Sequence, residues 1–139
     1  MNYIKHSLSV LTFLFISSVA MAEVAVIVHP SNSDAISQGD ISKIYLGKIK
    51  KFPGGKQALP LDKSEGEALR VQFLDKVVKK SEQQMKSYWS RLIFTGKGVP
   101  PKILSSDAEI VETVSRNPDA IGYVDSSSVN DSVKVILAF

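Results

Sequence analysis

The sequence predicts an α/β fold in which a largely parallel or mixed sheet is flanked by helices. Apolar runs rich in β-branched residues, such as Val24–Val28 and residues 120–124, are short and are bounded by polar or proline-containing turns. Such runs are typical of strands that are buried on both faces. Between them lie longer stretches in which apolar residues recur at helical spacing. Because strands and helices alternate along the chain, we expect the helices to cover the faces of one sheet.

The start of the chain is expected to be an export signal rather than part of the fold. Lys5 precedes an apolar run over residues 8–19, and Ala20-Met21-Ala22 matches a signal-peptidase site. The apolar run is too short to span a bilayer comfortably. We therefore predict a signal peptide over residues 1–22, cleaved after Ala22, and a single domain over residues 23–139. That domain is expected to be periplasmic and to have no membrane span.

Composition argues against several classes of protein. The chain of 139 residues has no cysteine, so we expect neither disulfides nor a lipid anchor on a cysteine. The formal net charge of +3 is small, and the basic residues are dispersed apart from short runs such as residues 48–51. Runs of this kind are usually solvated surface, so nucleic-acid binding has no support.

Helical segments are marked by their caps and apolar stripes. A short helix is expected to begin at Asp40 and to end before Gly47. A second helix is expected over residues 65–79, and two further helices are expected to begin after the capping boxes Ser81-x-x-Gln84 and Ser106-x-x-Glu109. The apolar stripes that should face the core are Ile41, Ile44 and Tyr45; Leu69, Phe73 and Val77; Met85, Tyr88, Trp89, Leu92 and Ile93; and Ile110, Val111 and Val114.

The remaining strands are shorter or more ambiguous. Residues 58–61 form a strand candidate in which Pro60 favours a sheet edge or a strand end. Residues 102–104 form a short candidate, and residues 133–137 form the closing strand. Within residues 120–124, Gly122 is expected to permit close backbone approach.

The stretch from the second strand into the helix that follows is the best candidate for a binding site. A strand that feeds a polar turn and then a helix aims backbone N–H groups at one spot, and the helix dipole favours anions there. Two cations, a serine and a glycine lie in this stretch. The predicted ligand-binding residues are Lys63, Ser64, Glu65, Gly66, Glu67 and Arg70.

The same residues also allow a purely structural interpretation. Ser64-Glu65-Gly66-Glu67 matches the Ser-x-x-Glu capping box, in which the Glu67 carboxylate would satisfy the free N–H groups itself. Such a carboxylate would compete with an anionic ligand. From the local residues alone, both interpretations stay open.

Enzymatic and metal-dependent functions have little support. His29 is the only histidine after the predicted cleavage site, cysteine is absent, and the acidic residues have no metal-ligand spacing. No serine or acid is placed with His29 to form a nucleophilic triad. We therefore expect no catalytic residues, no metal and no cofactor.

Four segments taken together resemble the phosphate-type substrate-binding proteins of ABC transporters. Residues 41–48 resemble the IFxGK segment of that family, and residues 63–73 resemble its anion loop, Arg-x-x-Gly-Ser-Gly-Thr-Arg-x-x-Phe. Residues 94–98 resemble a recurrent turn, and residues 117–124 resemble the tPgAIGYv strand. The segments occur in the family's order over nearly all of the predicted mature chain.

This resemblance implies a type II periplasmic-binding-protein fold, with length here for about one lobe. In the anion loop, Lys63 stands where the family has arginine, and Arg70 matches a family arginine. The residues at the family's anion-contacting Ser, Gly and Thr are Glu67, Ala68 and Leu69. Two hydroxyl donors are lost and one carboxylate is gained, which predicts weak binding because a buried oxyanion would lack donors.

We therefore expect an exported, non-enzymatic, solute-binding-like protein that is linked to phosphate ABC transport. It would bind phosphate or another small oxyanion weakly at the start of a helix. The alternative is a protein-interaction or sensory accessory module of the cell envelope that has lost tight anion binding. The partners considered are an ABC permease, a sensor, a porin, or a second copy of the chain in a homodimer.

Overall fold

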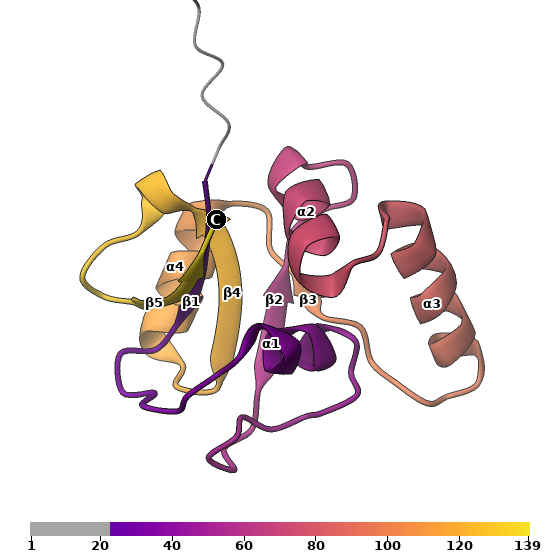
Figure 1. Ribbon diagram of the computed structural model, residues 1–139, viewed down its shortest axis with the longest axis horizontal. Coiled ribbons are helices and arrows are strands. Elements are labelled where there is room, and N and C mark those ends of the chain that lie inside the picture. Colours follow the sequence, from indigo (N-terminus) through magenta and orange to yellow (C-terminus); the bar gives the residue numbers. More distant parts are fainter. Residues whose placement is uncertain (1–22) are drawn as a thin grey trace, which may run out of the picture.

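A computed structural model describes residues 23–139, so the predicted signal peptide lies outside the described residues. One five-stranded sheet has the strand order β3-β2-β4-β1-β5. Figure 1 shows this sheet with helices packed around it. In chain order the elements are β1 (Val24–Val28), α1 (Gln38–Tyr45), β2 (Leu59–Asp62), α2 (Ala68–Phe73), the π-helical segment η1 (Leu74–Val78), α3 (Glu82–Phe94), β3 (Lys102–Ile103), α4 (Asp107–Arg116), β4 (Ala120–Asp125), the 3-10 turn η2 (Ser126–Ser128) and β5 (Lys134–Ala138).

The sheet is mixed, as the sequence predicts. β1 pairs antiparallel with β4 on one side and with β5 on the other. β2 pairs parallel with both β3 and β4. Pro60 pairs with β4 but lies outside the β2–β3 pairing, so the missing N–H of this proline is tolerated on the strand's free side.

The two central strands are buried on both faces, which confirms the interpretation of their continuous apolar runs. Every residue of β1 is buried. Val24, Val26 and Val28 face a core formed with α1, η1 and α3, whereas Ile27 faces a second core formed mainly with α4. This alternation follows from the two-residue period of a strand.

The first helix has the expected boundaries to within a few residues. Ser37 caps α1 through a reciprocal capping box with Asp40, so the helix begins at Gln38, two residues earlier than predicted. Gly47 adopts φ +66° just beyond the helix end, as expected of a glycine there.

The other predicted capping boxes are confirmed only in part. The box of Ser81 and Gln84 opens α3 as predicted. Ser106 accepts a hydrogen bond from the Glu109 N–H at the start of α4, but the Glu109 side chain accepts from Ser105 rather than from the Ser106 backbone. The neighbouring serine offers that carboxylate both a hydroxyl and an N–H, so the second half of the predicted box does not form.

The α3 stripe is buried only over its middle. Met85 and Trp89 are buried, and the indole packs so closely on Gly47 that a Cβ added there would lie 2.9 Å from Trp89 Cη2. Core packing of Trp89 is therefore confirmed. Ile93 is 54% exposed, so its predicted place in the core is wrong. Figure 1 shows α3 at one side of the molecule, apart from the sheet.

Gly122 allows α4 to pack closely on β4. A Cβ at this glycine would lie 2.6 Å from Ile110 Cγ2, a distance that real side chains do not tolerate. The glycine does permit a close approach, but the group that approaches it is a side chain of α4 and not another backbone. Within residues 23–139, no helix combines the length and the apolar character needed to cross a membrane.

Candidate functional site

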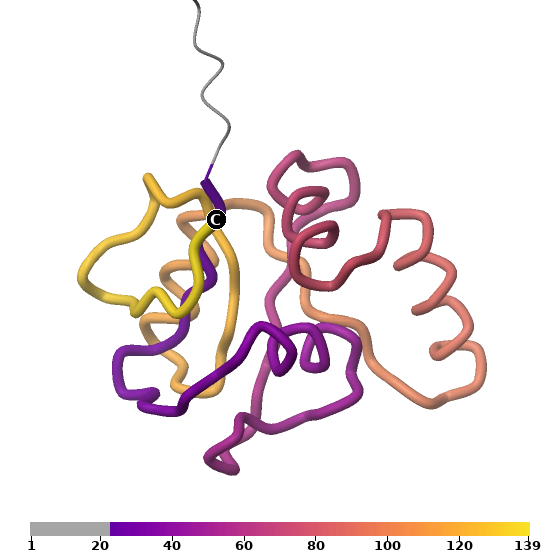
Figure 2. The backbone as a smooth tube through the Cα atoms, in the orientation of Figure 1, coloured from indigo at the N-terminus to yellow at the C-terminus, as the bar shows by residue number. Residues whose placement is uncertain are grey.

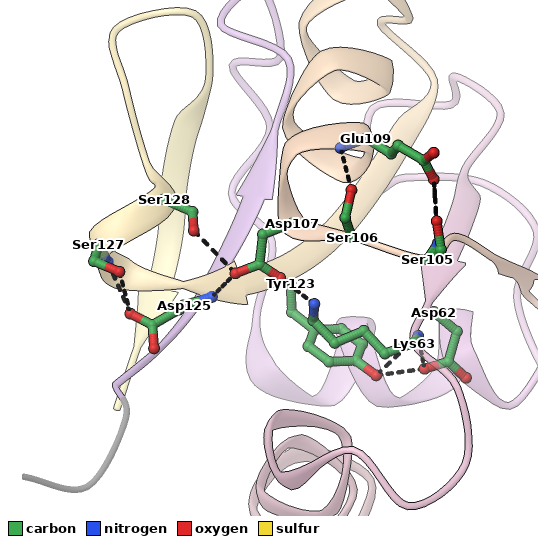
Figure 3. Close-up of polar contacts among 10 residues, drawn as sticks. All are labelled: Asp62, Lys63, Ser105, Ser106, Asp107, Glu109, Tyr123, Asp125, Ser127 and Ser128. Atoms are coloured by element: carbon green, nitrogen blue, oxygen red, sulfur yellow. Dashed lines mark hydrogen bonds and ion pairs between the residues drawn. The ribbon is translucent and has the colours of Figure 1, made fainter.

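Three parallel strands end at one edge of the sheet, and each is followed by a polar turn. β2, β4 and β3 run parallel, so the turns after Asp62, Asp125 and Ile103 meet at this edge. The turns lead into α2, η2 and α4 respectively. In open α/β sheets, ligands bind at the carboxyl ends of the strands, where helix N-termini converge. We call this region the carboxyl edge; Figure 3 shows its polar contacts.

The structure places all six predicted ligand-binding residues at the carboxyl edge. Ser64, Glu65 and Gly66 form the exposed part of the turn after β2, and Gly66 has φ +89°. Lys63 lies directly after the strand and is only 4% exposed. The two remaining residues are Glu67, which is the N-cap of α2, and Arg70, which lies within that helix.

The capping box predicted for this turn does not form. α2 begins at Ala68, three residues later than predicted, and its N-cap Glu67 makes no side-chain hydrogen bond to the helix start. Ser64 accepts a 3.3 Å hydrogen bond from the Glu67 N–H through its backbone carbonyl rather than through its hydroxyl. Gly66 in a left-handed conformation turns the chain before the helix begins, so the spacing of the two side chains no longer matches a cap.

The Lys63 ammonium is held by a carboxylate from another element. Its Nζ donates to Asp107 Oδ1 at the start of α4, in an ion pair with little exposure on the lysine side. The other oxygen of Asp107 accepts hydrogen bonds of 3.0 Å from the Asp125 N–H and from the Ser128 hydroxyl (Figure 3). Asp107 therefore ties together the turns that follow β2, β3 and β4.

Arg70 is held by two further carboxylates. Its Nε lies 3.3 Å from Asp62 Oδ1, and its Nη1 lies 3.0 Å from Glu82 Oε1. Burial of the guanidinium by itself would lower the pKa of Arg70, but the charges of Asp62 and Glu82 outweigh it and raise that pKa above its ordinary value. Arg70 is consequently a fixed cation.

Asp62 is also the centre of a buried hydrogen-bond network. It accepts from the Tyr123 hydroxyl and, at 2.8 Å, from the Lys63 N–H. Burial, followed by the negative charge of Asp62, raises the pKa of the Tyr123 hydroxyl above its ordinary value. Burial and Asp62 likewise raise the pKa of Tyr45, whose hydroxyl donates to the Leu61 carbonyl at 2.7 Å. Both tyrosines stay neutral donors.

One exposed backbone donor of the turn is also occupied. The Gly66 N–H donates to Glu82 Oε2 at 3.0 Å, so Glu82 bridges this amide and Arg70. Asp62, Glu82 and Asp107 thus pair with both cations of this edge and with the amides of Lys63 and Gly66. The structural interpretation therefore holds in part: the cations and the Gly66 amide are paired within the chain. Their partners are these three carboxylates and not Glu67.

These three carboxylates and Tyr123 were not singled out from the sequence. Asp107 and Lys63 are 44 residues apart, and Tyr123 and Asp62 are 61 residues apart. Nothing in local spacing links such pairs. The available signals were an aspartate at the end of an apolar strand and acidic residues in the first turns of two helices, which are ordinary features. Among residues 23–139, no group of three potential metal ligands comes together.

Comparison with solved structures identifies the fold. A protein from Clostridium perfringens described as a phosphate ABC transporter substrate-binding protein with bound phosphate is similar over 83% of this chain and 45% of its own, at 27% identity and a TM-score of 0.65. An ABC-type phosphate transport receptor from Vibrio cholerae covers 83% and 46%, at 18% identity and a TM-score of 0.55. PstS from Borrelia burgdorferi covers 83% and 47%, at 17% identity and a TM-score of 0.59.

The chain has the fold of a single type II periplasmic-binding-protein-like lobe, with a mixed sheet flanked by helices. More particularly, this is the fold of phosphate ABC transporter substrate-binding proteins, which confirms the resemblance predicted from the four sequence segments. The chain spans about half the length of these neighbours. No protein-family model matches the sequence, and no curated protein matches it in a sequence search.

Proposed function

We propose that the chain is an exported, non-enzymatic solute-binding-like protein that binds phosphate or a related small oxyanion weakly at the carboxyl edge. The observation that carries the proposal is the position of the exposed turn Ser64-Glu65-Gly66. It lies where three parallel strands end, beside Lys63 and Arg70, in the fold of a neighbour that holds phosphate. The neighbours' names supply the class of ligand, and the local residues supply the position.

The donors for such an anion would come from the exposed part of the turn. Ser64 offers a hydroxyl for which the structure gives no partner within residues 23–139, and the turn precedes the N-terminus of α2. The positive charges of Lys63 and Arg70, which are largely buried beside the turn, would attract the anion electrostatically. An oxyanion at a helix start gains both backbone hydrogen bonds and a favourable dipole.

Weak binding follows from the carboxylates already present. Asp62, Glu82 and Asp107 neutralise the two cations of the site, and Glu65 and Glu67 add negative charge to the turn. An incoming anion would have to share cations that are already partly neutralised. It would also approach Glu65 and Glu67, which form no ion pair within residues 23–139. Competition of this kind lowers affinity without abolishing the geometric site.

Export to the periplasm and a link to phosphate transport belong to the same proposal. They are supported by the predicted signal peptide over residues 1–22 and by the transport names of the structural neighbours. Binding to an ABC permease, a sensor or a porin stays a prediction, and so does formation of a homodimer.

Titration with phosphate, sulfate and small carboxylates tests the function. We expect phosphate to raise the free energy of unfolding, by about 1.4 kcal/mol when its concentration is about ten times the Kd. Ser64→Asp should abolish this effect by repulsion at the exposed turn without disturbing the fold. Ser33→Asp, which changes an exposed serine in the loop after β1, is the matched control. Failure of every anion to stabilise the wild type would reject the proposal.

A further inference from the structure

A groove of about 600 Å³ lies at the opposite edge of the parallel strands from the carboxyl edge. Its floor includes Leu59 and Ala120, the first residues of β2 and β4. One wall is the loop after α1, and the other is the connection between α3 and β3. Figure 2 shows both connections at the same end of the molecule. We call this hollow the lysine-rimmed groove.

The lysine-rimmed groove carries cations and no acid. Lys50, Lys97 and Lys102 line it, and no aspartate or glutamate does. The chain segments around the two walls have the same charge character. Residues 46–61 and residues 91–106 contain seven lysines and arginines between them and no acidic residue. The carboxyl edge, by contrast, is rich in acids. The positive charge of the groove is therefore local and is not neutralised within the groove.

The interior of the groove is largely apolar and includes three residues that have no backbone N–H. Pro60, Pro100 and Pro101 line it, and proline has no N–H to offer a ligand. Pairing of a ligand with the free side of β3 as an additional strand is also disfavoured. β3 has only two residues, and the two prolines before it lack the N–H groups that such pairing needs. A ligand would therefore be held by apolar side chains seated in the groove, with the lysine ammonium groups as donors at the rim.

Apolar surface continues beyond the groove. Val99, in the groove wall, is 87% exposed, and Phe94, at the end of α3, is 92% exposed. Val99 belongs to the connection that forms a groove wall and Phe94 directly precedes that connection, and exposed apolar side chains next to a groove favour an interaction site there. The cations of the groove come from three separate positions, Lys50, Lys97 and Lys102, and lie in the same groove as exposed Val99. Several separated cations beside apolar side chains favour a segment of protein, which has several side chains of its own, over a small molecule.

We propose that the lysine-rimmed groove binds an acidic peptide segment of a partner protein, whose apolar side chains enter the groove and whose carboxylates meet the rim lysines. This site lies apart from the exposed turn Ser64-Glu65-Gly66 at the carboxyl edge and uses none of its residues. It adds a second binding activity to the proposed function and does not depend on it.

The test uses a fluorescently labelled peptide of alternating leucine and aspartate, with a leucine–lysine peptide as its charge-reversed counterpart. Fluorescence anisotropy should show binding of the acidic peptide alone, and raising NaCl from about 0.05 to about 0.5 M should weaken it because exposed charge pairs are screened. In ¹⁵N-labelled protein, the amide shifts should centre on Leu59, Val99 and Lys102.

Variants separate the groove from general electrostatics. Lys97→Glu combined with Lys102→Glu should weaken peptide binding by about tenfold, and Val99→Asp should weaken it several-fold. The matched control, Lys76→Glu with Lys86→Glu, makes the same charge change on exposed helical positions and should leave binding within about twofold. All of these side chains are exposed, so the thermal midpoints should stay close to that of the wild type.

Four outcomes would overturn the proposal: no binding of the acidic peptide at millimolar concentration, equal binding of the leucine–lysine peptide, equal loss in the control variant, or shifts centred on the carboxyl edge. Self-association that buries the groove against a second copy would overturn it too. So would saturation of the groove by decanoate without any binding of the peptide.

Discussion

At the residue scale, the carboxyl edge is governed by how its charges are paired. Lys63 is buried against Asp107, and Arg70 lies between Asp62 and Glu82. Breaking a buried pair from one side is costly because the remaining charge has no solvent to stabilise it. These residues are therefore poor targets for testing ligand binding, since their substitution would also disturb the fold. The exposed residues of the turn are better targets.

Glu67 is the most informative of these. It is the N-cap of α2 but makes no capping hydrogen bond, and serine is a favoured N-cap residue. We expect Glu67→Ser to raise the free energy of unfolding by about 0.5–1 kcal/mol, measured by chemical denaturation. It should also strengthen phosphate binding, because one carboxylate is removed and one hydroxyl is added.

The matched control for this change is Glu65→Ser. It removes the same charge from the same turn but does not alter the N-cap position. It should strengthen phosphate binding without the gain in stability. A loss of stability in Glu67→Ser would show that the glutamate does cap the helix in solution and would contradict the structure.

The buried hydroxyl of Tyr123 should make the free energy of unfolding depend on pH in the alkaline range. Burial and the charge of Asp62 raise the pKa of this hydroxyl above its ordinary value of 10.0, whereas in the unfolded chain it ionises near that value. Above about pH 10, the unfolded state therefore binds fewer protons than the folded state, and the free energy of unfolding falls as pH rises. One such group contributes a slope of up to about 1.4 kcal/mol per pH unit.

Tyr123→Phe should reduce that slope by about this amount, measured by urea denaturation between about pH 9.5 and 11.5. The two proteins differ by this hydroxyl alone, so the difference between the two slopes isolates the tyrosine. Tyr45→Phe should act in the same direction, because burial raises the pKa of Tyr45 as well. Identical slopes in wild type and Tyr123→Phe would refute the buried network.

At the element scale, the helix that follows the exposed turn Ser64-Glu65-Gly66 changes from α-helical to π-helical before it ends. α2 continues without a break into η1, and Lys79 ends this segment with φ +60° and ψ +41°. Within residues 23–139, Lys79 is the only residue other than glycine with positive φ. A left-handed conformation is strained for a residue with a side chain, which is why glycine is usual at such a helix end. Here the position is occupied by lysine.

Lys79→Gly should therefore raise the free energy of unfolding by about 0.5–1 kcal/mol, which thermal or urea denaturation can measure. Lys76→Gly, inside η1 and also exposed, should lower it by about 1 kcal/mol. Opposite signs for the two substitutions are the expected result. A loss of similar size in both would mean that residue 79 does not adopt the left-handed conformation.

Local patterns in the sequence were sufficient for much of the fold. The continuous β-branched run of β1, the Ser81 cap and the Gly47 helix end each depend on residues close together in sequence, and each is confirmed. The errors have tertiary causes. Ile93 has helical periodicity but no element covers it, and the Ser64–Glu67 spacing fits a capping box that the turn at Gly66 prevents.

The candidate site was predictable in position but not in its pairing. Lys63 and Arg70 could be placed beside the turn because strand, turn and helix follow one another in the chain. Their carboxylate partners Asp107 and Glu82 come from other elements, so only the assembled sheet and helices bring them close. Long-range charge pairing of this kind has no periodic signal in a single sequence.

At the scale of the whole molecule, charge is divided between two edges of one sheet. The carboxyl edge holds Asp62, Glu65, Glu67, Glu82 and Asp107 around two cations, and the lysine-rimmed groove at the other edge has cations and no acid. The chain thus presents two surfaces of different chemistry on a fold that spans about half the length of its phosphate-binding neighbours. Each surface can be tested without changing the other.

The most direct test of the central claim is a ¹⁵N–¹H NMR titration of residues 23–139 with inorganic phosphate. We expect saturable shifts that are largest for the amides of Ser64, Glu65 and Gly66, and the Ser64→Asp variant should lose them. The absence of saturable shifts at the turn, or shifts confined to the lysine-rimmed groove, would contradict oxyanion binding at the carboxyl edge.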